Sequence, residues 1–199
     1  MEKIKIKNEG YVNCKSSFYS VDDVLNSQEF EFKKGSNILQ GEIDSGIFAI
    51  TYIIAMYKKT NKKTLFLPLV AEVDGVNIEL SELSKTACYM DMTNPLFSSR
   101  KSVVCLINKG LKKSKLPYTA KEILEGFFIS DFKYKMPVRA CGNEKIRIMA
   151  AIGYAWGKEI FCFPWYSKHR YENAFGENIS FSTEKLSELG KIVICPIGK

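Results

Sequence analysis

The loop from Gly41 to Gly46 constrains the fold more than any other feature of the sequence. It follows a candidate for a short buried strand at Asn37 to Gln40 and precedes Ile47 to Tyr57, which is apolar on almost every side. The apolar segment is too short to cross a membrane and too long for a typical strand, so it predicts a buried helix. A strand, a loop with a glycine at each end and a buried helix, in this order, are typical of an α/β fold.

The loop has the glycine spacing of a phosphate-binding loop, whose frame is G-x-x-x-x-G-K-[ST]. Its lysine position is Ile47 and its Ser/Thr position is Phe48, so hydrocarbon replaces both the cation and the magnesium-binding hydroxyl. Glu42 and Asp44 also place two carboxylates close to Ser45 inside the loop. Two like charges about 4 Å apart repel by about 1 kcal/mol in water and by about 4 kcal/mol near a protein surface. The loop is therefore predicted to bind a nucleoside triphosphate weakly or not at all.

The rest of the chain alternates between strand and helix patterns. Lys3 to Lys7 alternates lysine with isoleucine and is interpreted as an edge strand, and Asp74-Gly75 predicts a hairpin turn. Ile160 to Phe163 and Ile192 to Cys195 are short apolar strands separated by a helical pattern. A helix between two buried strands implies a crossover connection and therefore parallel strands.

Four further segments follow the loop in an order that one known family shares. They are Val73-Asp74-Gly75-Val76-Asn77-Ile78, Tyr89 to Phe97, Ala140 to Arg147, and Ile160 to Phe163. With the loop, they resemble the short hairpin, the glutamine-loop region, the signature sequence and the strand before the catalytic acids of ATP-binding cassette (ABC) domains. The family's glutamine is replaced by Asp91 or Met92, depending on the alignment.

This resemblance implies a fold for the chain as a whole. It extends from about Phe30 to Ile197 and implies a P-loop NTPase-like ABC ATPase domain of the α/β class. Such a domain has an N-terminal antiparallel β subdomain, a mostly parallel core sheet and a small helical subdomain. We therefore expect a single domain over residues 1–199, with the helical lobe at about residues 93–145.

The signature-like segment is Cys141-Gly142-Asn143-Glu144. Gly142 and Glu144 match the family's sequence, whereas Cys141 replaces a serine and Asn143 replaces a glycine. In ABC domains the signature faces the phosphate loop of a second cassette, so the resemblance implies a surface that contacts a partner. A catalytic thiol at Cys141 is the alternative, but no histidine accompanies it in the sequence.

The resemblance also shows which catalytic residues are missing. Counted from the signature, the family's two acids fall at Pro164 and Trp165, and a second alignment places them at Cys162 and Phe163. Neither alignment supplies a carboxylate to hold a metal or to orient water. The one histidine of the sequence, His169, lies upstream of the strand that precedes the family's switch histidine. The resemblance therefore implies a pseudo-ATPase with no catalytic residues, no metal site and no cofactor.

Composition and charge exclude several other classes. The net charge is +7, but the lysines are scattered along the chain. Their densest group, at Lys109 to Lys115, is short and has no interleaved aromatics, which does not favour nucleic-acid binding. There is no C-x-x-C pair, no apolar signal-peptide core and no apolar run long enough to span a membrane. We expect a cytoplasmic protein, located in the cytoplasm or peripherally at the inner face of the cell membrane.

Two functions from different classes remain open, and a third has less support. The first is a non-catalytic subunit that pairs, as a homo- or heterodimer, with an intact ABC ATPase, a membrane permease or both, docking through Met92 to Arg100. In this reading only its partners contact the membrane. The second is a stand-alone protein- or peptide-binding regulatory module that retains only the fold. The third is an enzyme with other nucleotide chemistry, whose phosphate-binding residues would be Tyr57, Lys58, Lys59 and the group Lys109, Lys112, Lys113 and Lys115. Separately, the resemblance places Phe18 and Tyr19 where ABC domains have an aromatic residue that stacks on the base.

Overall fold

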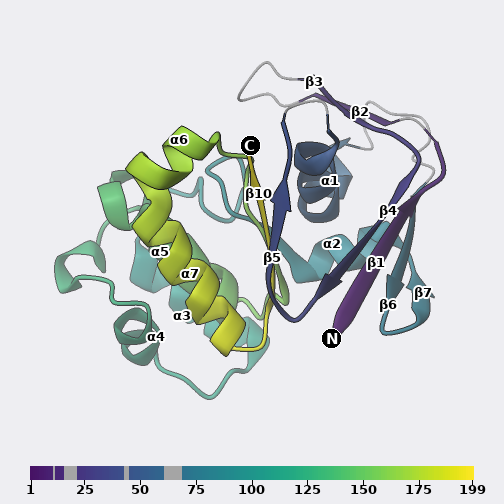
Figure 1. The fold of residues 1–199 in the computed structure, drawn as a ribbon. Coiled ribbons are helices and arrows are strands. Elements are labelled where there is room, and N and C mark those ends of the chain that lie inside the picture. Colours follow the sequence, from purple (N-terminus) through teal and green to yellow (C-terminus); the bar gives the residue numbers. More distant parts are fainter. Residues whose placement is uncertain (11, 16–21, 43–44, 61–68) are drawn as a thin grey trace.

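The computed structural model of the chain describes residues 1–10, 12–15, 22–42, 45–60 and 69–199 (Figure 1). Three residues that the sequence singles out, Phe18, Tyr19 and Asp44, lie outside these ranges. In the described part of the chain, no helix is long and apolar enough to cross a membrane.

The N-terminal strands form an antiparallel sheet in the order β4-β1-β6-β7. Its strands are β1 (Lys3–Asn8), β4 (Gln28–Lys33), β6 (Leu69–Val73) and β7 (Val76–Ile78). Since β1 pairs with β4 on one side and with β6 on the other, the expected edge position was wrong. The alternation instead arises because Ile4 and Ile6 are fully buried on one face, while the intervening lysines point away from the core. The predicted hairpin at Asp74-Gly75 is confirmed, with positive φ angles at both residues.

A second sheet of four strands is entirely parallel, in the order β5-β10-β9-β8. Its strands are β5 (Gly35–Gln40), β10 (Ile192–Ile197), β9 (Ile160–Cys162) and β8 (Ala87–Tyr89). The apolar pattern of β9 and β10 reflects burial on both faces. Phe161 and Val193 face one core cluster, whereas Ile160 and Ile192 face the other. As an edge strand, β5 is less buried than expected, with Ile38 55% exposed.

Helices cover both faces of the parallel sheet (Figure 1). Helix α1 (Ile47–Thr60) lies between the two sheets, and this position explains its apolar surface, since Ile50, Ile53 and Ile54 are fully buried. Helix α2 (Leu80–Thr86) packs beside α1, whereas α5 (Lys145–Ala155) and α7 (Gly176–Glu188) lie on the opposite side of the parallel sheet. The expected α/β architecture is confirmed.

The middle of the chain forms a helical region that packs against α5. It contains α3 (Val103–Ser114), α4 (Ala120–Gly126) and three 3-10 turns, at Asp131–Lys133, Val138–Ala140 and Gly142–Glu144. Thr119 caps α4, and its hydroxyl and backbone amide exchange hydrogen bonds with Glu122 in a capping box. The short α6 (Lys168–Arg170) and a π-helical turn at Tyr171–Phe175 lead into α7. A further strand pair joins β2 (Val12–Lys15) to β3 (Asp22–Leu25).

Candidate functional site

The glycine loop lies at the carboxyl end of the parallel sheet, where ligands of α/β proteins bind. The backbone amide of Gly41 donates to the carbonyl of Ile197 at 3.0 Å, which ties the loop to β10. The amide of Ser45 donates back to the carbonyl of Glu42 at 3.2 Å. Gly46 has a φ of +81°, and Ile47 follows it as the first residue of α1. The predicted strand, loop and helix are therefore present in the predicted order.

The inside of this loop is filled by its own side chains. A Cβ atom added at Gly41 would lie 2.5 Å from the Ser45 Oγ and 3.2 Å from the Ile47 Cδ1. Ile47 is 6% exposed and Phe48 is 4% exposed, so both side chains belong to the core. Glycine is required at position 41 because the loop folds tightly onto itself. The space above this glycine is occupied by a hydroxymethyl group and an aliphatic side chain.

Phe48 begins an aromatic cluster that reaches the parallel sheet. Its ring stacks on Tyr52 at 5.8 Å, and the Tyr52 ring meets the edge of Tyr89, on β8, at 5.3 Å. Burial raises the pKa of Tyr89 well above its ordinary value, so this phenol stays protonated. The hydroxyl of Thr51, three residues after Phe48, donates to the Phe48 carbonyl at 2.9 Å. A nucleotide's metal and phosphates would find hydrocarbon at this helix start.

Trp165 and the C-terminus hold the loop from the other side. The Trp165 indole N–H donates to the Gly41 carbonyl at 3.1 Å, and a Cβ at Gly198 would lie 3.0 Å from the same indole. The backbone amide of Lys199 donates to the Glu42 carboxylate at 2.9 Å. Glu42 thus ties the loop to Lys199. Glu42 takes part in none of the ion pairs found among the described residues. Every contact here stabilises a closed loop.

The candidate positions for the catalytic acids lie at the end of β9. Phe163 is fully buried, and its amide continues the pairing with β10 by donating to Ile194 at 2.9 Å. Pro164 is buried, Trp165 is the indole that contacts the loop, and burial raises the pKa of the Cys162 thiol well above its ordinary value. In either alignment, the residues at the two acid positions are buried in the core or, for Trp165, bonded to the loop.

The signature-like turn is open where the loop is closed. Gly142 has a φ of +58° and is exposed, and a Cβ added there would meet no atom within 4 Å. Asn143 beside it is also exposed. Cys141 points inward and is fully buried, and its Sγ lies 3.4 Å from the Pro137 carbonyl. Because burial raises the pKa of this thiol, the alternative of a catalytic Cys141 loses its physical basis.

Glu144 fixes the turn to the helical region. Its carboxylate accepts hydrogen bonds from the Ser130 amide at 2.9 Å and from the Ser130 hydroxyl at 2.6 Å. Partial burial opposes ionisation, but these hydrogen bonds outweigh it and lower the pKa of Glu144. Arg147, one turn further along α5, donates to the Phe128 carbonyl at 3.1 Å. Glu144 and Arg147 therefore both bind groups of this chain itself, and Glu144 holds the turn in place.

The structure groups the predicted site residues into two separate sets. The loop residues lie with Trp165 at the end of the parallel sheet, whereas the signature-like residues lie at the start of α5. No hydrogen bond or ion pair among the described residues joins the two sets. The role of Lys199 was not predicted, because nothing in the sequence indicates that a backbone amide so distant in sequence would meet Glu42. The described residues also contain no group of three or more His, Cys, Asp or Glu side chains placed to hold a metal ion.

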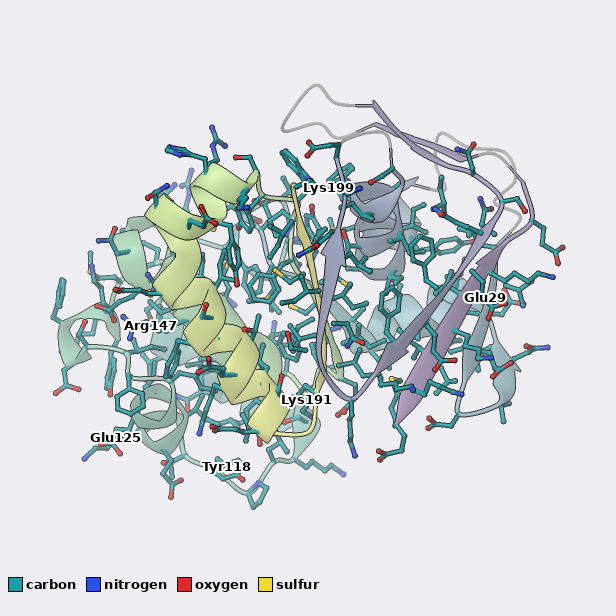
Figure 2. The ribbon with its side chains drawn as sticks, viewed as in Figure 1. Glu29, Tyr118, Glu125, Arg147, Lys191 and Lys199 are labelled. Atoms are coloured by element: carbon teal, nitrogen blue, oxygen red, sulfur yellow. The ribbon has the colours of Figure 1, made fainter. Side chains whose placement is uncertain are left out.

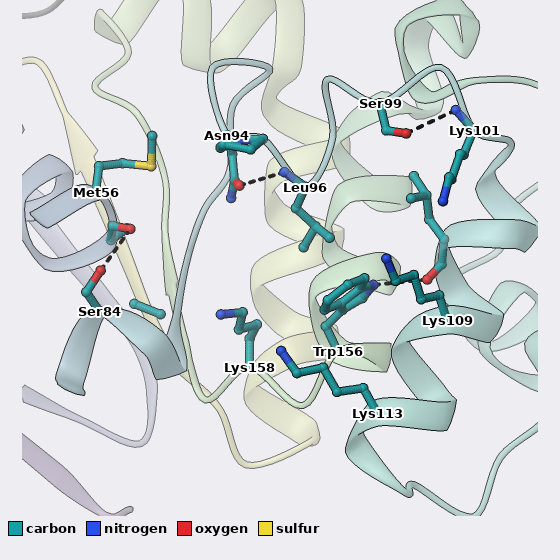
Figure 3. A pocket seen from close by; sticks show the side chains of 14 residues that line it. Met56, Ser84, Asn94, Leu96, Ser99, Lys101, Lys109, Lys113, Trp156 and Lys158 are labelled. Atoms are coloured by element: carbon teal, nitrogen blue, oxygen red, sulfur yellow. Dashed lines mark hydrogen bonds between the residues drawn. The ribbon is translucent and has the colours of Figure 1, made fainter. Parts of the chain in front are cut away.

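A cavity of about 520 Å³, which the sequence did not indicate, lies elsewhere on the molecule, between α2 and α3 (Figure 3). Four of its lining residues belong to the segment that the resemblance assigns to docking: Asn94, Pro95, Leu96 and Ser99. Of the basic group on and after α3, Lys109 and Lys113 line the cavity, whereas Lys112 and Lys115 do not. The side chains of Lys58 and Lys59 lie outside the described part of the structure.

No protein-family model matches this sequence, and no curated protein matches it either. Solved structures do match. A putative ABC transporter ATP-binding protein from Pyrococcus furiosus is 17% identical, with a TM-score of 0.62 over 98% of this chain and 90% of that one. The bacterial ABC transporter cassette MJ0796, described as dimeric, is 16% identical, with a TM-score of 0.63 over 98% of this chain and 87% of that one.

A third solved structure extends the likeness to a protein of a larger assembly. The cbiO1 protein of Clostridium perfringens, described as part of the ABC transporter complex cbiONQ, is 15% identical. Its TM-score is 0.63 over 100% of this chain and 80% of that chain. At such low identity the agreement concerns the path of the backbone, which here includes both sheets and the helical region. This chain therefore has the fold of an ATP-binding cassette domain of the ABC transporters.

Proposed function

We propose that this chain is a non-catalytic cassette subunit that pairs with an intact ABC ATPase, a membrane permease or both, in a transport complex. The observation that carries the proposal is the contrast between two features. In the glycine loop, Ser45 and Ile47 fill the space beside Gly41 and Phe48 is buried in the core, whereas the turn at Gly142 is open. The first feature argues against binding a nucleotide in the usual position. The second leaves a surface that a partner can contact.

The argument against nucleotide binding rests on several losses at one place. Ile47 offers no cation, Phe48 offers no hydroxyl, and the Glu42 carboxylate would repel a triphosphate. Each charge-assisted hydrogen bond that is lost removes about 1.5 to 3 kcal/mol. Opening the loop would also break the hydrogen bonds from Trp165 and Lys199. We therefore propose that the chain uses no cofactor and hydrolyses no ATP.

The argument for a partner rests on the open turn and on the structural relatives. Gly142 and Asn143 project from the start of α5, and Glu144 holds the turn without a partner's help. The MJ0796 cassette is described as dimeric and cbiO1 as part of a transporter complex, which is consistent with pairing of this chain. The segment proposed to dock on a permease, Met92 to Arg100, contributes to the wall of the cavity. Membrane contact would then be made through the partner.

Thermal shift with ATP and magnesium tests the first half of the proposal. A ligand present at about a hundred times its Kd stabilises a protein by about 2.7 kcal/mol, so binding would raise the melting temperature visibly. We expect no shift at millimolar ATP and no magnesium-dependent phosphate release. A shift that disappears when Gly46 is replaced by a bulky residue would contradict the proposal.

Co-purification with an intact ABC ATPase encoded beside this chain's gene tests the second half. We expect a complex, and we expect the partner's hydrolysis rate to change when the complex forms. Asn143→Arg should weaken the complex, because it places a bulky charge on the exposed turn, whereas Lys121→Glu on α4 serves as the matched surface control. If neither binding nor a change in rate is seen, the stand-alone protein- or peptide-binding module becomes the better description.

A further inference from the structure

The cavity between α2 and α3 is separate from both predicted sites and has a distinct chemistry (Figure 3). One part of its lining is apolar, with Met56, Leu96, Leu106 and Trp156 as the larger side chains. The rest carries four lysines and no carboxylate; these are Lys101, Lys109, Lys113 and Lys158. An apolar cavity with charges of one sign at its margin is suited to a ligand that carries the opposite charge on an apolar body.

Two of the lysines meet at one aromatic ring. The Nζ atoms of Lys109 and Lys113 lie 5.7 Å and 5.3 Å from the centroid of the Trp156 ring. Both residues come from the same face of α3, one helical turn apart, so their ammonium groups repel each other. The indole N–H is already bonded to the Leu106 carbonyl at 3.0 Å, which fixes the ring in this position. The ring is therefore a rigid apolar surface with two ammonium groups over it.

The positive charge of the cavity is not neutralised within the molecule. Among the described residues, no ion pair includes any of the four lysines. Lys158 donates to the Lys85 carbonyl, which is a neutral acceptor. Burial lowers the pKa of Lys158, and the charge of Lys113 lowers it further against an opposing effect of Cys88. An anion bound here would relieve repulsion among these groups.

We propose that this cavity binds a small organic anion with a flat apolar body, such as an aromatic sulfonate, carboxylate or phosphate ester. The apolar body lies against Trp156, and the anionic group lies between Lys109 and Lys113. The volume of about 520 Å³ is in the range of small-molecule sites, which is roughly 300 to 1,000 Å³. Because Asn94 to Ser99 shares this wall, a bound anion would also contact the segment proposed to dock on a permease.

Fluorescence titration with 8-anilinonaphthalene-1-sulfonate tests the proposal on the isolated chain. Trp165→Phe leaves Trp156 as the one remaining tryptophan, so energy transfer from indole to probe reports binding near the cavity. We expect saturable transfer that weakens with added salt. The uncharged analogue N-phenyl-1-naphthylamine should bind about tenfold more weakly or worse, because it lacks the sulfonate. Calorimetric titration of the unmodified chain repeats the measurement without the tryptophan substitution.

Charge variants on one helix provide the matched control. The double variant Lys109→Gln, Lys113→Gln should weaken binding of the sulfonate by about tenfold or more, whereas Lys112→Gln, exposed on the same helix but outside the cavity, should leave it unchanged. Equal affinity for the charged and uncharged probes would overturn the proposal, as would equal losses in the two variants. Saturable binding of a glutamate-rich peptide without binding of the sulfonate would also overturn it and identify a protein-docking surface. None of these measurements depends on nucleotide or on a partner cassette.

Discussion

The loop at residues 41–48 and the turn at residues 141–144 are the two parts of this chain that most resemble ABC motifs, and they have opposite physical states. In the loop, side chains fill the interior, and Trp165 and Lys199 close it with hydrogen bonds. In the turn, the backbone at Gly142 is open to solvent, and Glu144 supports it from behind. Figure 2 shows side chains filling the space around both sheets.

This difference fits the proposal of a non-catalytic cassette. In the loop, the Gly41 carbonyl needs a hydrogen-bond donor, and the Trp165 indole supplies one. In the turn, Gly142 and Asn143 stay accessible, and the support comes from Glu144 of the same chain. Under the proposal, the loop is a structural element and the turn is the contact surface.

Replacing Phe48 should have the largest effect on stability. Phe48→Ala removes a side chain that is 4% exposed and stacked on Tyr52, and such deletions typically cost about 3 to 5 kcal/mol. Urea denaturation should show this loss, with Val76→Ala, which is 64% exposed, changing stability by about 0.5 kcal/mol or less. A loss of stability at Phe48 as small as that at Val76 would mean that side chains pack loosely at the start of α1. The contrast between a filled loop and an open turn would then be wrong.

Trp165→Phe should have the next largest effect and lower the free energy of unfolding by about 2 kcal/mol. The substitution keeps an aromatic ring but removes the donor to the Gly41 carbonyl, which is left without this hydrogen bond. Urea denaturation measures the loss, and hydrogen exchange should show faster opening at the C-terminal residues. Phe132→Leu, at a position 66% exposed, is the control and should be close to neutral. A neutral Trp165→Phe would show that the indole fills space without holding the loop.

Glu144→Gln should cost about 1 to 1.5 kcal/mol near neutral pH, since the charge on the acceptor of two hydrogen bonds is lost. The pKa of Glu144 is lowered in the folded state from a usual value of 4.5, so its contribution is present above that value and disappears as pH falls through the lower folded pKa. Unfolding measured at about pH 7 and about pH 3 should therefore show a larger difference between variant and parent at the higher pH. Glu125→Gln is the control. Glu125 forms an exposed ion pair with Lys121 at 3.6 Å, so this variant should unfold with almost the same free energy as the parent at either pH.

The smallest effect is expected at Gly142. Gly142→Ala should destabilise by about 1 kcal/mol, because a side chain is strained at φ of +58° although there is space for it. Gly126→Ala is the matched comparison, since this glycine also has no atom within 4 Å of an added Cβ but lies in α4 with helical backbone. It should be neutral or stabilising by about 0.5 to 1 kcal/mol. Equal effects at the two glycines would mean that the turn relaxes to another conformation.

Much of the fold could be predicted from local pattern. The apolar run at Ile47 predicts α1, and the short apolar runs predict β9 and β10, because each signal is contained within a few residues. The edge position of β1 was wrong, because alternation indicates one buried face and carries no information about how many neighbours a strand has. The cavity was not predicted either, since α1, α2, α3 and the segment around Trp156 meet only in three dimensions.

The sequence by itself determined which chemistry is absent at the loop, since no arrangement of Ile47 and Phe48 can supply a charge or a hydroxyl. Only the tertiary structure decided what takes the place of that chemistry: Ser45 and Ile47 within the loop, Trp165 beside it, and the amide of Lys199 on Glu42. The physical reason is the distance along the chain over which each feature is set. Composition is a property of each position alone, whereas a hydrogen bond between distant residues exists only once the parallel sheet has brought their strand ends together.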